Sequence, residues 1–573
     1  MKKILKEILV KQIPIFIVLL IFVALNEYIF TLPSKILGRI IDMLYDIEAN
    51  IHLINKNLLF LLLSAIGILF TRAVWKTCIG FSTRQFERKL KDKIFTQFMK
   101  LNLTSVQNTK NGELMSYLTK DVGEVRGFLY RTESHVTRIV LTSIIVFITM
   151  KNVNTALSLA IVGIILFTMI ISLILKKRIE LSFKKAQAEF TRVSEYVQES
   201  TDAIRTTKAY FGEQKQLDKF IELDENLKNS NIKVDKNATL LDSTVDVCFG
   251  LCIATIILFG SRLVLAGKMT IGDLVAFSGY VDLLFVPVYW LPGVLSKFQR
   301  AKISYGRLDK VFSLNTEPIS LEDSKNFKNK IDGDIEIKDL TFTYPSKEYS
   351  NLKNINISIK KGHKLGIIGT IGSGKTTLAN LLLRLYDVPR GTITIDGKDV
   401  NDIDLDELRN SICYITQDNF LFSTTIENNI ALFKDEDEKK VFQSVIKSVF
   451  KEDLDNMKDG LQTVIGERGI DLSGGQKQRV VIARSFLLNN NILIFDDCFS
   501  ALDNKTEEKL LSNLYFEAKD KTCIIISNRI SDVKNSDEII VLDKGEIVER
   551  GKHDDLIENG GLYAKFYQKQ SSN

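Results

Sequence analysis

Long apolar runs within the first 300 residues limit what this chain can fold into more than any other feature. The hydrocarbon core of a bilayer is ~30 Å thick, so a helix needs ~20 predominantly apolar residues to cross it. Six runs are near this length, and we predict that each forms a membrane-spanning helix. These runs are Ile13–Pro33, Leu58–Gly80, Ser134–Met150, Ala156–Leu175, Thr244–Ala266 and Asp273–Phe298.

The first run follows Lys2, Lys3 and Lys6, an arrangement that cleaved signal peptides share. No small-residue cleavage site follows the run, and Asn26 and Glu27 interrupt it. We therefore expect this run to be retained as a membrane helix.

The loops between the runs predict the orientation of the chain. Residues 81–135 contain ten Lys and Arg and residues 176–240 contain thirteen, whereas residues 34–57 contain three. Lysine and arginine are enriched in cytoplasmic loops. We therefore expect a multi-pass protein of the cell membrane whose two termini, together with its C-terminal domain, are cytoplasmic.

The two long basic loops have a helical pattern, so we expect them to extend the membrane helices into the cytoplasm. Asn111–Met115 and Asp202–Thr206 would then lie near the tips, where they can meet a cytoplasmic domain. The alternative is that these loops are solvated and bind anionic lipid.

The chain is too long for one hydrophobic core, at 573 residues. The stretch 313–332 is polar and aperiodic, which is typical of a linker. We predict an all-α transmembrane domain of six helices over residues 1–312, a linker over 313–332, and a soluble α/β domain over 333–573.

Composition excludes several classes of protein. The six cysteines form no CxxC pair, which disfavours structural zinc and a disulfide framework. The net charge is only +6, and the basic residues flank apolar runs rather than alternate with aromatic residues. We therefore expect no nucleic-acid partner and a lipid bilayer instead.

A phosphate-binding loop is the strongest motif in the α/β part. A strand-like run, Lys364–Ile368, precedes it and a helical run, Thr377–Leu385, follows it, which is the context that this motif requires. Glycines let backbone N–H groups approach phosphate oxygens, the lysine supplies positive charge and the last hydroxyl suits Mg²⁺. The expected ATP-binding residues are Gly369, Thr370, Ile371, Gly372, Ser373, Gly374, Lys375, Thr376 and Thr377.

A second apolar strand, Ile492–Phe495, leads into Asp496 and Asp497. The carboxyl end of a parallel strand next to a phosphate loop is where Mg²⁺ requires a carboxylate. We therefore predict Asp496 as a metal ligand, together with Thr376.

A third segment, Leu472–Gln476, precedes the helical run Lys477–Leu488. The hydroxyl and backbone amides at such a helix start can bind phosphate, although a simple glycine-rich cap is the alternative. Because the chain already has a phosphate loop, this second site makes sense if it serves a nucleotide held by another subunit. Its predicted nucleotide-binding residues are Ser473, Gly474, Gly475 and Gln476.

With these motifs, the whole chain resembles a half-transporter of the ABC exporters, in which six membrane helices are fused to an α/β P-loop ATPase domain. Leu472–Gln476 is similar to the ABC signature motif. The resemblance implies that ATP and Mg²⁺ are the cofactors and that Tyr344 stacks on adenine. It also implies that Gln417 contacts Mg²⁺ and the attacking water, and that Ser500–Asp503 forms the D-loop.

The resemblance assigns three further segments to contacts between the two domains. Thr463–Gly469 resembles a segment that touches the cytoplasmic loops, and Gly112-Glu113 and Ala209–Phe211 look like parts of those loops.

Two residues depart from the pattern of the family. Asp497 stands where the family has a glutamate that polarises the attacking water, and Asn528 stands where it has a switch histidine. Both changes affect one catalytic centre, so we predict a site that binds ATP but hydrolyses it slowly. We further predict a heterodimer with a different chain that carries the glutamate and the histidine, completed by the signature motif of this chain.

The sequence does not name the cargo. We expect a small amphipathic molecule; a lipid flippase, a peptide exporter and a regulatory membrane ATPase remain alternatives. Glu27, Arg72, Asp246 and Asp282 fall within or near the predicted spans, where ionisable groups are costly. The acidic residues on the fifth and sixth spans favour a cationic cargo, whereas pairing between helices or a place at the membrane boundary is the alternative.

Overall fold

The computed structural model describes residues 2–44, 47–109, 111–131, 135–317, 331–345, 351–466 and 472–571. The chain forms two compact units, and each is considered by itself. The first consists of Met1–Met99 and Lys110–Leu314, and the second of Lys100–Thr109 and Asn315–Asn573. Most of the predicted linker lies outside the described residues.

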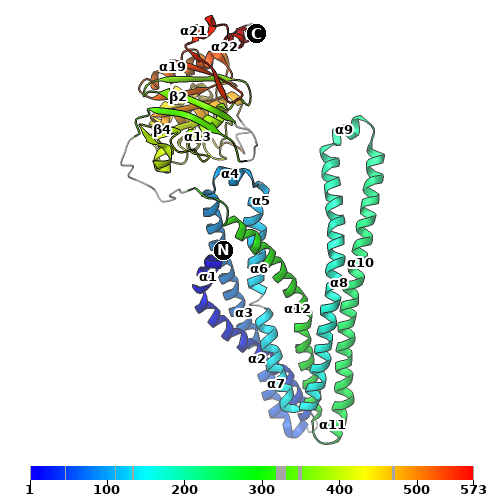
Figure 1. Cartoon of the computed structure of the whole chain (residues 1–573). Coiled ribbons are helices and arrows are strands. Elements are labelled where there is room, and N and C mark those ends of the chain that lie inside the picture. Colours follow the sequence, from blue (N-terminus) through cyan, green and yellow to red (C-terminus); the bar gives the residue numbers. More distant parts are fainter. Residues whose placement is uncertain are drawn as a thin grey trace. The chain divides into compact units, whose positions relative to one another are not determined.

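The first unit is entirely helical where it is described (Figure 1). Its α-helices are α1 (Lys2–Val10), α2 (Ile13–Met43), α3 (Ile47–Met99), α5 (Asn111–Ser116), α6 (Val122–Arg131), α7 (Thr137–Val153), α8 (Thr155–Asp202), α9 (Ile204–Ala209), α10 (Glu213–Thr255), α11 (Ser261–Leu265) and α12 (Ile271–Val311), with π-helical turns at Tyr117–Asp121 and Ile256–Gly260.

Five helices in the described residues are long and apolar enough to cross a membrane. They correspond to the first, second, fourth, fifth and sixth predicted spans. The predicted third span falls on α7, whose 17 residues are at the lower limit for a membrane helix. Its predicted first residue, Ser134, lies outside the described part of the chain.

Close packing of glycines joins α2 to α12. A Cβ atom on Gly272 would lie 2.0 Å from the carbonyl oxygen of Gly38, and the reverse substitution would place a Cβ 2.5 Å from the carbonyl oxygen of Gly272. Asp42 accepts hydrogen bonds from the Thr270 hydroxyl at 2.8 Å and from the Gly272 amide at 2.7 Å. Small residues permit this approach of two backbones, as is common between membrane helices.

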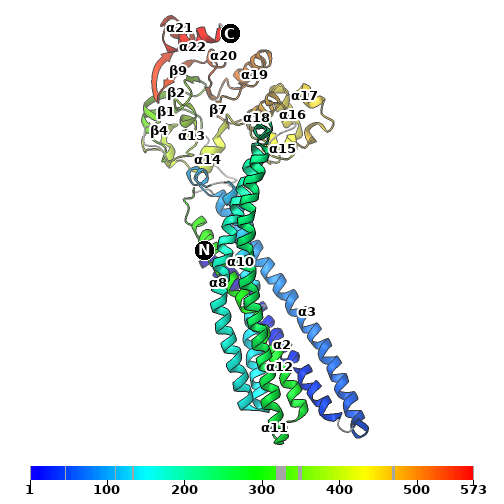
Figure 2. The same ribbon diagram turned by 90° about the vertical axis from the view of Figure 1, so that its right-hand side faces the viewer.

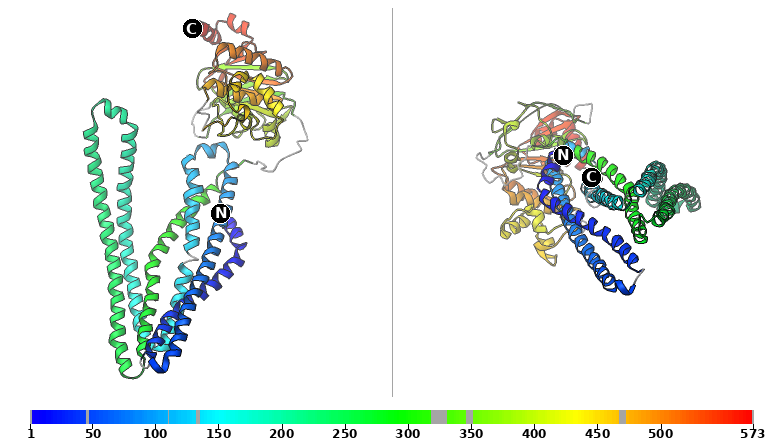
Figure 3. Two further views of the ribbon diagram at one scale, coloured as in Figure 1. Left: turned by 180° about the vertical axis from the view of Figure 1, so that it is seen from behind. Right: turned by 90° about the horizontal axis from the view of Figure 1, so that it is seen from below.

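Helices α8 and α10 form a long hairpin that ends at α9. They run side by side in Figures 2 and 3, and this hairpin diverges from α3, α6 and α12 within the same unit. Asp202 closes α8 just before this tip, as predicted from the sequence. In the first loop, α4 (Leu103–Gln107) precedes the predicted segment, which begins α5 at Asn111.

The second unit contains two sheets. An antiparallel sheet has the strand order β2-β1-β4-β5, and a mainly parallel sheet has the order β10-β9-β3-β8-β7-β6. The strands are β1 (Ile335–Phe342), β2 (Leu352–Ile359), β3 (Lys364–Gly369), β4 (Ile393–Ile395), β5 (Lys398–Asp399), β6 (Ile412–Ile415), β7 (Ile492–Asp496), β8 (Thr522–Ile526), β9 (Glu538–Asp543) and β10 (Glu546–Gly551).

Apolar residues on both faces of the parallel sheet explain its central position. Along β8, Cys523 and Ile525 face one core, whereas Ile524 and Ile526 face the other. Such strands read as continuous apolar runs because neither face meets water. The helices of this unit are α13 (Lys375–Leu382), α14 (Leu405–Ser411), α15 (Ile426–Ala431), α16 (Glu438–Lys447), α17 (Lys451–Asp455), α18 (Gly474–Leu488), α19 (Asn504–Glu517), α20 (Ile530–Val533), α21 (His553–Glu558) and α22 (Leu562–Ser571).

Helix α4 belongs to this second unit although it lies early in the sequence. Leu103 packs against the core beneath the antiparallel sheet. The Asn102 amide donates to the carbonyl oxygen of Asn315 at 3.2 Å, and the Tyr386 hydroxyl donates to Gln107 Oε1 at 2.9 Å. The segment Lys100–Thr109, between α3 and α5, is therefore part of the α/β unit.

Candidate nucleotide site

The order of the parallel strands brings the predicted ATP-site residues to one edge of the sheet. Strand β3 pairs with β8, β8 with β7 and β7 with β6, all in parallel. Their carboxyl ends therefore share an edge, from which the phosphate loop, Asn528, Asp497 and Gln417 emerge. This edge is where ligands bind in open parallel sheets.

The phosphate loop requires its glycines for conformation and for space. Gly372 and Gly374 have φ angles of +82° and +105°, which favour glycine. A Cβ on Gly374 would lie 2.6 Å from the Leu352 side chain, and one on Gly369 would lie 2.1 Å from the carbonyl oxygen of Leu542. The loop is therefore fixed by its surroundings, while Ile371 at its tip is exposed.

Lys375 begins α13, and its side chain folds back over the loop. Its Nζ donates to the carbonyl oxygens of Gly369 at 2.9 Å and Thr370 at 3.0 Å. Burial lowers the pKa of Lys375, while the charges of Asp497 and Asp496 act in the opposite direction. The ammonium group is thus held over the concave loop, where it can bind phosphate oxygens.

Asp496 ends β7 and is buried. Its carboxylate accepts hydrogen bonds from Thr376 and from the Tyr414 hydroxyl, the latter at 3.1 Å. Burial raises the pKa of Asp496, while these hydrogen bonds act in the opposite direction. Two of the three predicted Mg²⁺ ligands, Asp496 and Thr376, are therefore in contact.

The three predicted catalytic residues meet at one oxygen atom. Asp497 Oδ2 accepts hydrogen bonds from Gln417 Nε2 and from Asn528 Nδ2, each at 3.3 Å. Asp497 has a φ of +49°, a conformation that few residues other than glycine adopt, and its amide donates to the Ile526 carbonyl at 2.8 Å. The backbone thereby turns this carboxylate toward the end of β8.

Tyr344 lies half-buried just beyond β1. Its hydroxyl is 2.9 Å from the Thr377 hydroxyl, and its ring lies edge-on to Tyr386 with 4.9 Å between ring centroids. Tyr344 is therefore beside the first turn of α13. Stacking on adenine stays a prediction.

The signature segment forms a separate group of contacts. Ser473 caps α18 by accepting from the Gln476 amide at 3.3 Å, and Gln476 Oε1 accepts from the Ser473 amide at 2.9 Å. A Cβ on Gly475 would lie 3.1 Å from the carbonyl oxygen of Ala501, and Gly474 lies beside the same residue. Within the described residues, the signature makes no hydrogen bond to the phosphate loop.

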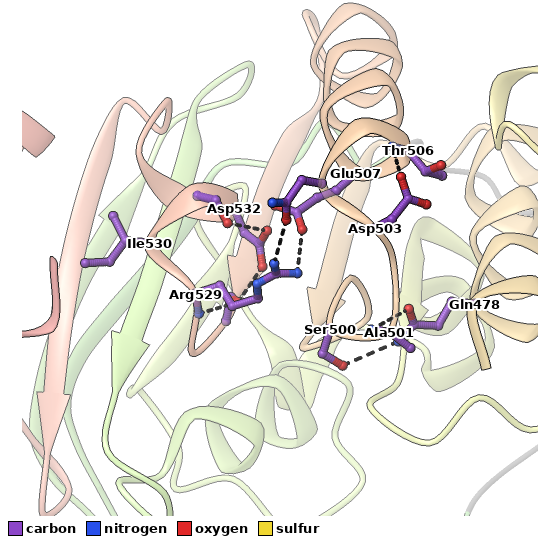
Figure 4. Close-up of polar contacts among 12 residues, drawn as sticks. Gln478, Ser500, Ala501, Asp503, Thr506, Glu507, Arg529, Ile530 and Asp532 are labelled. Atoms are coloured by element: carbon purple, nitrogen blue, oxygen red, sulfur yellow. Dashed lines mark hydrogen bonds and ion pairs between the residues drawn. The ribbon is translucent and has the colours of Figure 1, made fainter. Parts of the chain in front are cut away.

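The predicted D-loop, Ser500–Asp503, is held to α18 by one glutamine. Gln478 Oε1 accepts from the Ala501 amide at 3.0 Å, and its Nε2 lies 3.5 Å from the Ser500 hydroxyl (Figure 4). Asp503 then caps α19 by accepting from the Thr506 amide at 3.0 Å. These contacts join the predicted D-loop to the helix that begins in the signature segment.

Two acidic residues near the end of β8, Glu507 and Asp532, were not predicted from the sequence as part of the site. Arg529 donates to Glu507 at 2.5 Å (Figure 4). The Ser527 hydroxyl donates to Asp532 at 2.5 Å. Both carboxylates are buried, and burial raises the pKa of Asp532 to about 7. Of these residues, only Arg529 could have been singled out from the sequence, because it directly follows Asn528 at the predicted switch position.

Only part of the predicted contact segment Thr463–Gly469 lies among the described residues. Thr463–Gly466 is described, and Thr425 and Val464 form an isolated antiparallel bridge. Residues 467–469 of that segment lie outside the described part of the chain.

Comparison with known proteins identifies both units. Residues 16–288 match the model of the ABC transporter transmembrane region, and residues 352–500 match that of the ABC transporter ATPase domain. The fold matches a bacterial Atm1-family ABC exporter with ATP bound, with a TM-score of 0.81 and 24% identity over 98% of this chain and 100% of that chain.

Several relatives are similar over nearly their full length. The probable multidrug resistance ABC transporter YheI of Bacillus subtilis is 34% identical over 94% of this chain and 92% of its own. The multidrug resistance-like protein MdlA of Escherichia coli is 30% identical over 97% and 93%, respectively. The lipid A-core flippase of Vibrio cholerae is 30% identical over 88% and 87%. The chain therefore belongs to the ABC transporter family, as an ATP-hydrolysing, membrane-spanning transporter of the exporter type.

Proposed function

We propose that this chain is one half of a dimeric exporter that uses ATP to move an amphipathic molecule across the cell membrane, and that its own ATP site turns over slowly. The observation that carries the proposal is the environment of Asp497, whose Oδ2 lies between the amides of Gln417 and Asn528. The multi-pass helical unit and the relatives described as multidrug transporters support export.

The residues at the sheet edge fit ATP and Mg²⁺. The glycine loop is concave, Lys375 is held over it, and the buried Ser373 hydroxyl makes no hydrogen bond within the described residues. These groups would bind the phosphates, and Asp496, Thr376 and Gln417 would hold Mg²⁺. When bound, Mg²⁺ neutralises phosphate charge and ATP supplies the γ-phosphate.

The slow turnover follows from side-chain length and proton chemistry. An aspartate is one methylene shorter than a glutamate, which withdraws its carboxylate by ~1.5 Å. A misplacement of ~1 Å reduces a catalysed rate by ~10²-fold. Asn528 donates hydrogen bonds but carries no charge, unlike a protonated histidine.

A homodimer would place this weakened centre at both ATP sites. The separate contacts of the signature and the phosphate loop support an arrangement in which Ser473–Gln476 serves a nucleotide on a partner chain. A partner with glutamate and histidine at the corresponding positions would then carry the fast site. The site of this chain would retain ATP as a clamp.

The orientation of the chain in the membrane is also part of the proposal. The basic loops support a cytoplasmic location for the ATPase unit and both termini, because cytoplasmic loops are enriched in lysine and arginine. Export of lipid is the alternative cargo class, supported by the flippase among the relatives. Reconstitution with fluorescent lipid or with drug-like dyes separates these cargoes.

The test compares the purified full chain with the complex that copurifies with it from its own cells. The chain alone should bind ATP and show little ATPase activity, whereas the complex should be active and stimulated by cargo. Dimers of the chain alone with the full, cargo-stimulated ATPase activity of the complex would refute the heterodimer.

A further inference from the structure

A half-open cavity of about 350 Å³ in the helical unit is lined by residues of α2, α3, α6, α7 and α12 and by His135. Four of its lining residues carry basic groups and two are the only tryptophans of the chain. No carboxylate is among the described residues that line it. The basic residues are Arg72, Lys76, His135 and Arg138, and the tryptophans are Trp75 and Trp290.

The nearest buried acid is already neutralised. Glu27 of α2 is 1% exposed and accepts hydrogen bonds from Arg138 at 2.5 Å and from the Thr142 hydroxyl at 2.6 Å, one on each carboxylate oxygen. The Arg138 guanidinium also lies over the Trp290 ring, 4.9 Å from its centroid. Pairing between helices thus accounts for Glu27, which leaves it poorly suited to bind a cationic cargo.

Asp246 is also engaged, since the Tyr289 hydroxyl donates to it at 3.0 Å. Glu27 and Asp246, of which Asp246 is one of the two acidic residues that favoured a cationic cargo, therefore have partners within the unit. Neither of them lines the cavity.

Arg72 and Lys76 provide positive charge that no carboxylate among the described residues pairs with. They are four residues apart on α3, so their side chains lie on one face of the helix. The Arg72 guanidinium lies 5.7 Å from the centroid of the Phe30 ring, and its buried Nε has no hydrogen-bond partner in the described part of the chain. Neither side chain forms an ion pair with a carboxylate among the described residues. A buried donor without a partner is costly, and a bound anion would remove that cost.

The depth of this pair suits uptake from the cytoplasmic side. Arg72 follows Leu58, the first residue of the predicted second span, by 14 residues, or ~21 Å along the helix. That distance is more than half of the ~30 Å of a hydrocarbon core. With cytoplasmic termini, the cavity therefore lies toward the cytoplasmic leaflet.

We propose that this cavity binds an amphipathic organic anion, with a phosphate or carboxylate group held by Arg72 and Lys76. Its apolar part would pack against Trp75, Trp290 and Phe30. This inference deepens the proposed export function and rests on it, because it assigns the charge of the cargo. The anion can come from a lipid headgroup or from a free amphiphile.

The two tryptophans in the lining allow ligand binding in the cavity to be measured by intrinsic fluorescence. The full chain is placed in phosphatidylcholine nanodiscs, and its intrinsic fluorescence is titrated with decyl phosphate or with decyltrimethylammonium, which has the same chain and opposite charge. Decyl phosphate should give a saturable change, and decyltrimethylammonium should give none. An equal response to both, or a response to the cation alone, would overturn the proposal.

Variants test whether the fluorescence change with decyl phosphate depends on Arg72 and Lys76. Arg72→Gln combined with Lys76→Gln should weaken decyl phosphate binding by about tenfold or more, since charge-assisted hydrogen bonds are lost. Arg72→Lys retains charge and should bind with intermediate affinity. Arg88→Gln changes an exposed arginine on the same helix and should have no effect. Unchanged affinity in the folded double variant would contradict the assignment.

A second arm distinguishes the sources of the anion. Replacing phosphatidylcholine by phosphatidylglycerol should shift the fluorescence in an Arg72-dependent way if a lipid headgroup occupies the cavity, and should leave it unchanged if the cargo is a free amphiphile. Binding requires no ATP turnover. An active exporter without an anion response would therefore refute this inference alone, while the proposed function would stand.

Discussion

Asn528 donates a hydrogen bond from Nδ2 to Oδ2 of Asp497 across 3.3 Å, and Gln417 donates to the same oxygen. Two amide donors therefore converge on the carboxylate that follows the strand aspartate. Neither amide can take up a proton or carry charge. These contacts hold the Asp497 carboxylate between the segments that follow β6 and β8, in line with the slow hydrolysis that we propose for this site.

Restoring the longer carboxylate and the histidine should increase ATP hydrolysis by the chain alone. We expect Asp497→Glu combined with Asn528→His to raise phosphate release by up to ~10²-fold, because the base then reaches the attacking water. The same pair of changes together with Lys375→Ala should remain inactive. An unchanged rate in a variant that still binds ATP would show that these two residues do not limit turnover.

Gln417 should matter more for transport than for nucleotide affinity. In Gln417→Ala, we expect ATP binding to stay within a few-fold of the native value while transport falls, since the side chain contacts Asp497 rather than the phosphate loop. Binding of a fluorescent ATP analogue and transport in proteoliposomes measure the two effects. A loss of affinity as large as that in Lys375→Ala would contradict this role.

The folding stability of the ATPase unit should fall as pH rises toward neutrality. Burial raises the pKa of Asp532 from 3.8 to about 7, so the folded state binds more protons than the unfolded chain between these values. The stabilisation is therefore complete below about pH 4 and is lost as pH rises through about 7.

Asp532→Asn should remove this dependence. We expect the thermal midpoint of the native chain to fall relative to that of the variant between about pH 5 and pH 8, corresponding to a few kcal/mol. Asp520→Asn changes an exposed aspartate and should follow the native profile. Parallel profiles for the native chain and Asp532→Asn would show that ionisation of this carboxylate is not costly.

The contact between α2 and α12 should tolerate no added methyl group. A Cβ on Gly272 would overlap the carbonyl oxygen of Gly38, so Gly272→Ala should destabilise the helical unit by about 1–3 kcal/mol. Gly250→Ala, on α10, meets nothing within 4 Å and serves as the control. Thermal unfolding in detergent measures both. Equal stability of the two variants would exclude a backbone contact at this position.

Local sequence predicted most of the ATP site because each motif carries its own geometry. Strand, glycine loop and helix are contiguous around Lys375, and Asp496 ends a wholly apolar strand. Since parallel strands end at one edge, these motifs lie together once the strand order is known. The contact of Gln417 with Asp497 follows from the neighbouring positions of β6 and β7.

Contacts between residues that are far apart in the chain could not be predicted from the sequence. Glu27 and Arg138 are 111 positions apart, and no sequence pattern identifies either as the partner of the other. The contact of Arg529 with Glu507 depends on how α19 packs beside β8. Similarly, α4 joins the α/β unit through Gln107, which no motif marks. Tertiary packing, rather than local pattern, determines these contacts.

The central claim is that the two ATP sites of the assembled exporter are unequal, and one comparison tests it most directly. ATPase activity is measured in the copurified complex carrying either Asp497→Asn or Ser473→Ala in this chain. Asp497→Asn should scarcely change turnover, because the site of this chain already hydrolyses slowly, whereas Ser473→Ala should abolish most activity by disabling the signature that completes the fast site of the partner. Loss of most activity in Asp497→Asn, with little change in Ser473→Ala, would contradict the account.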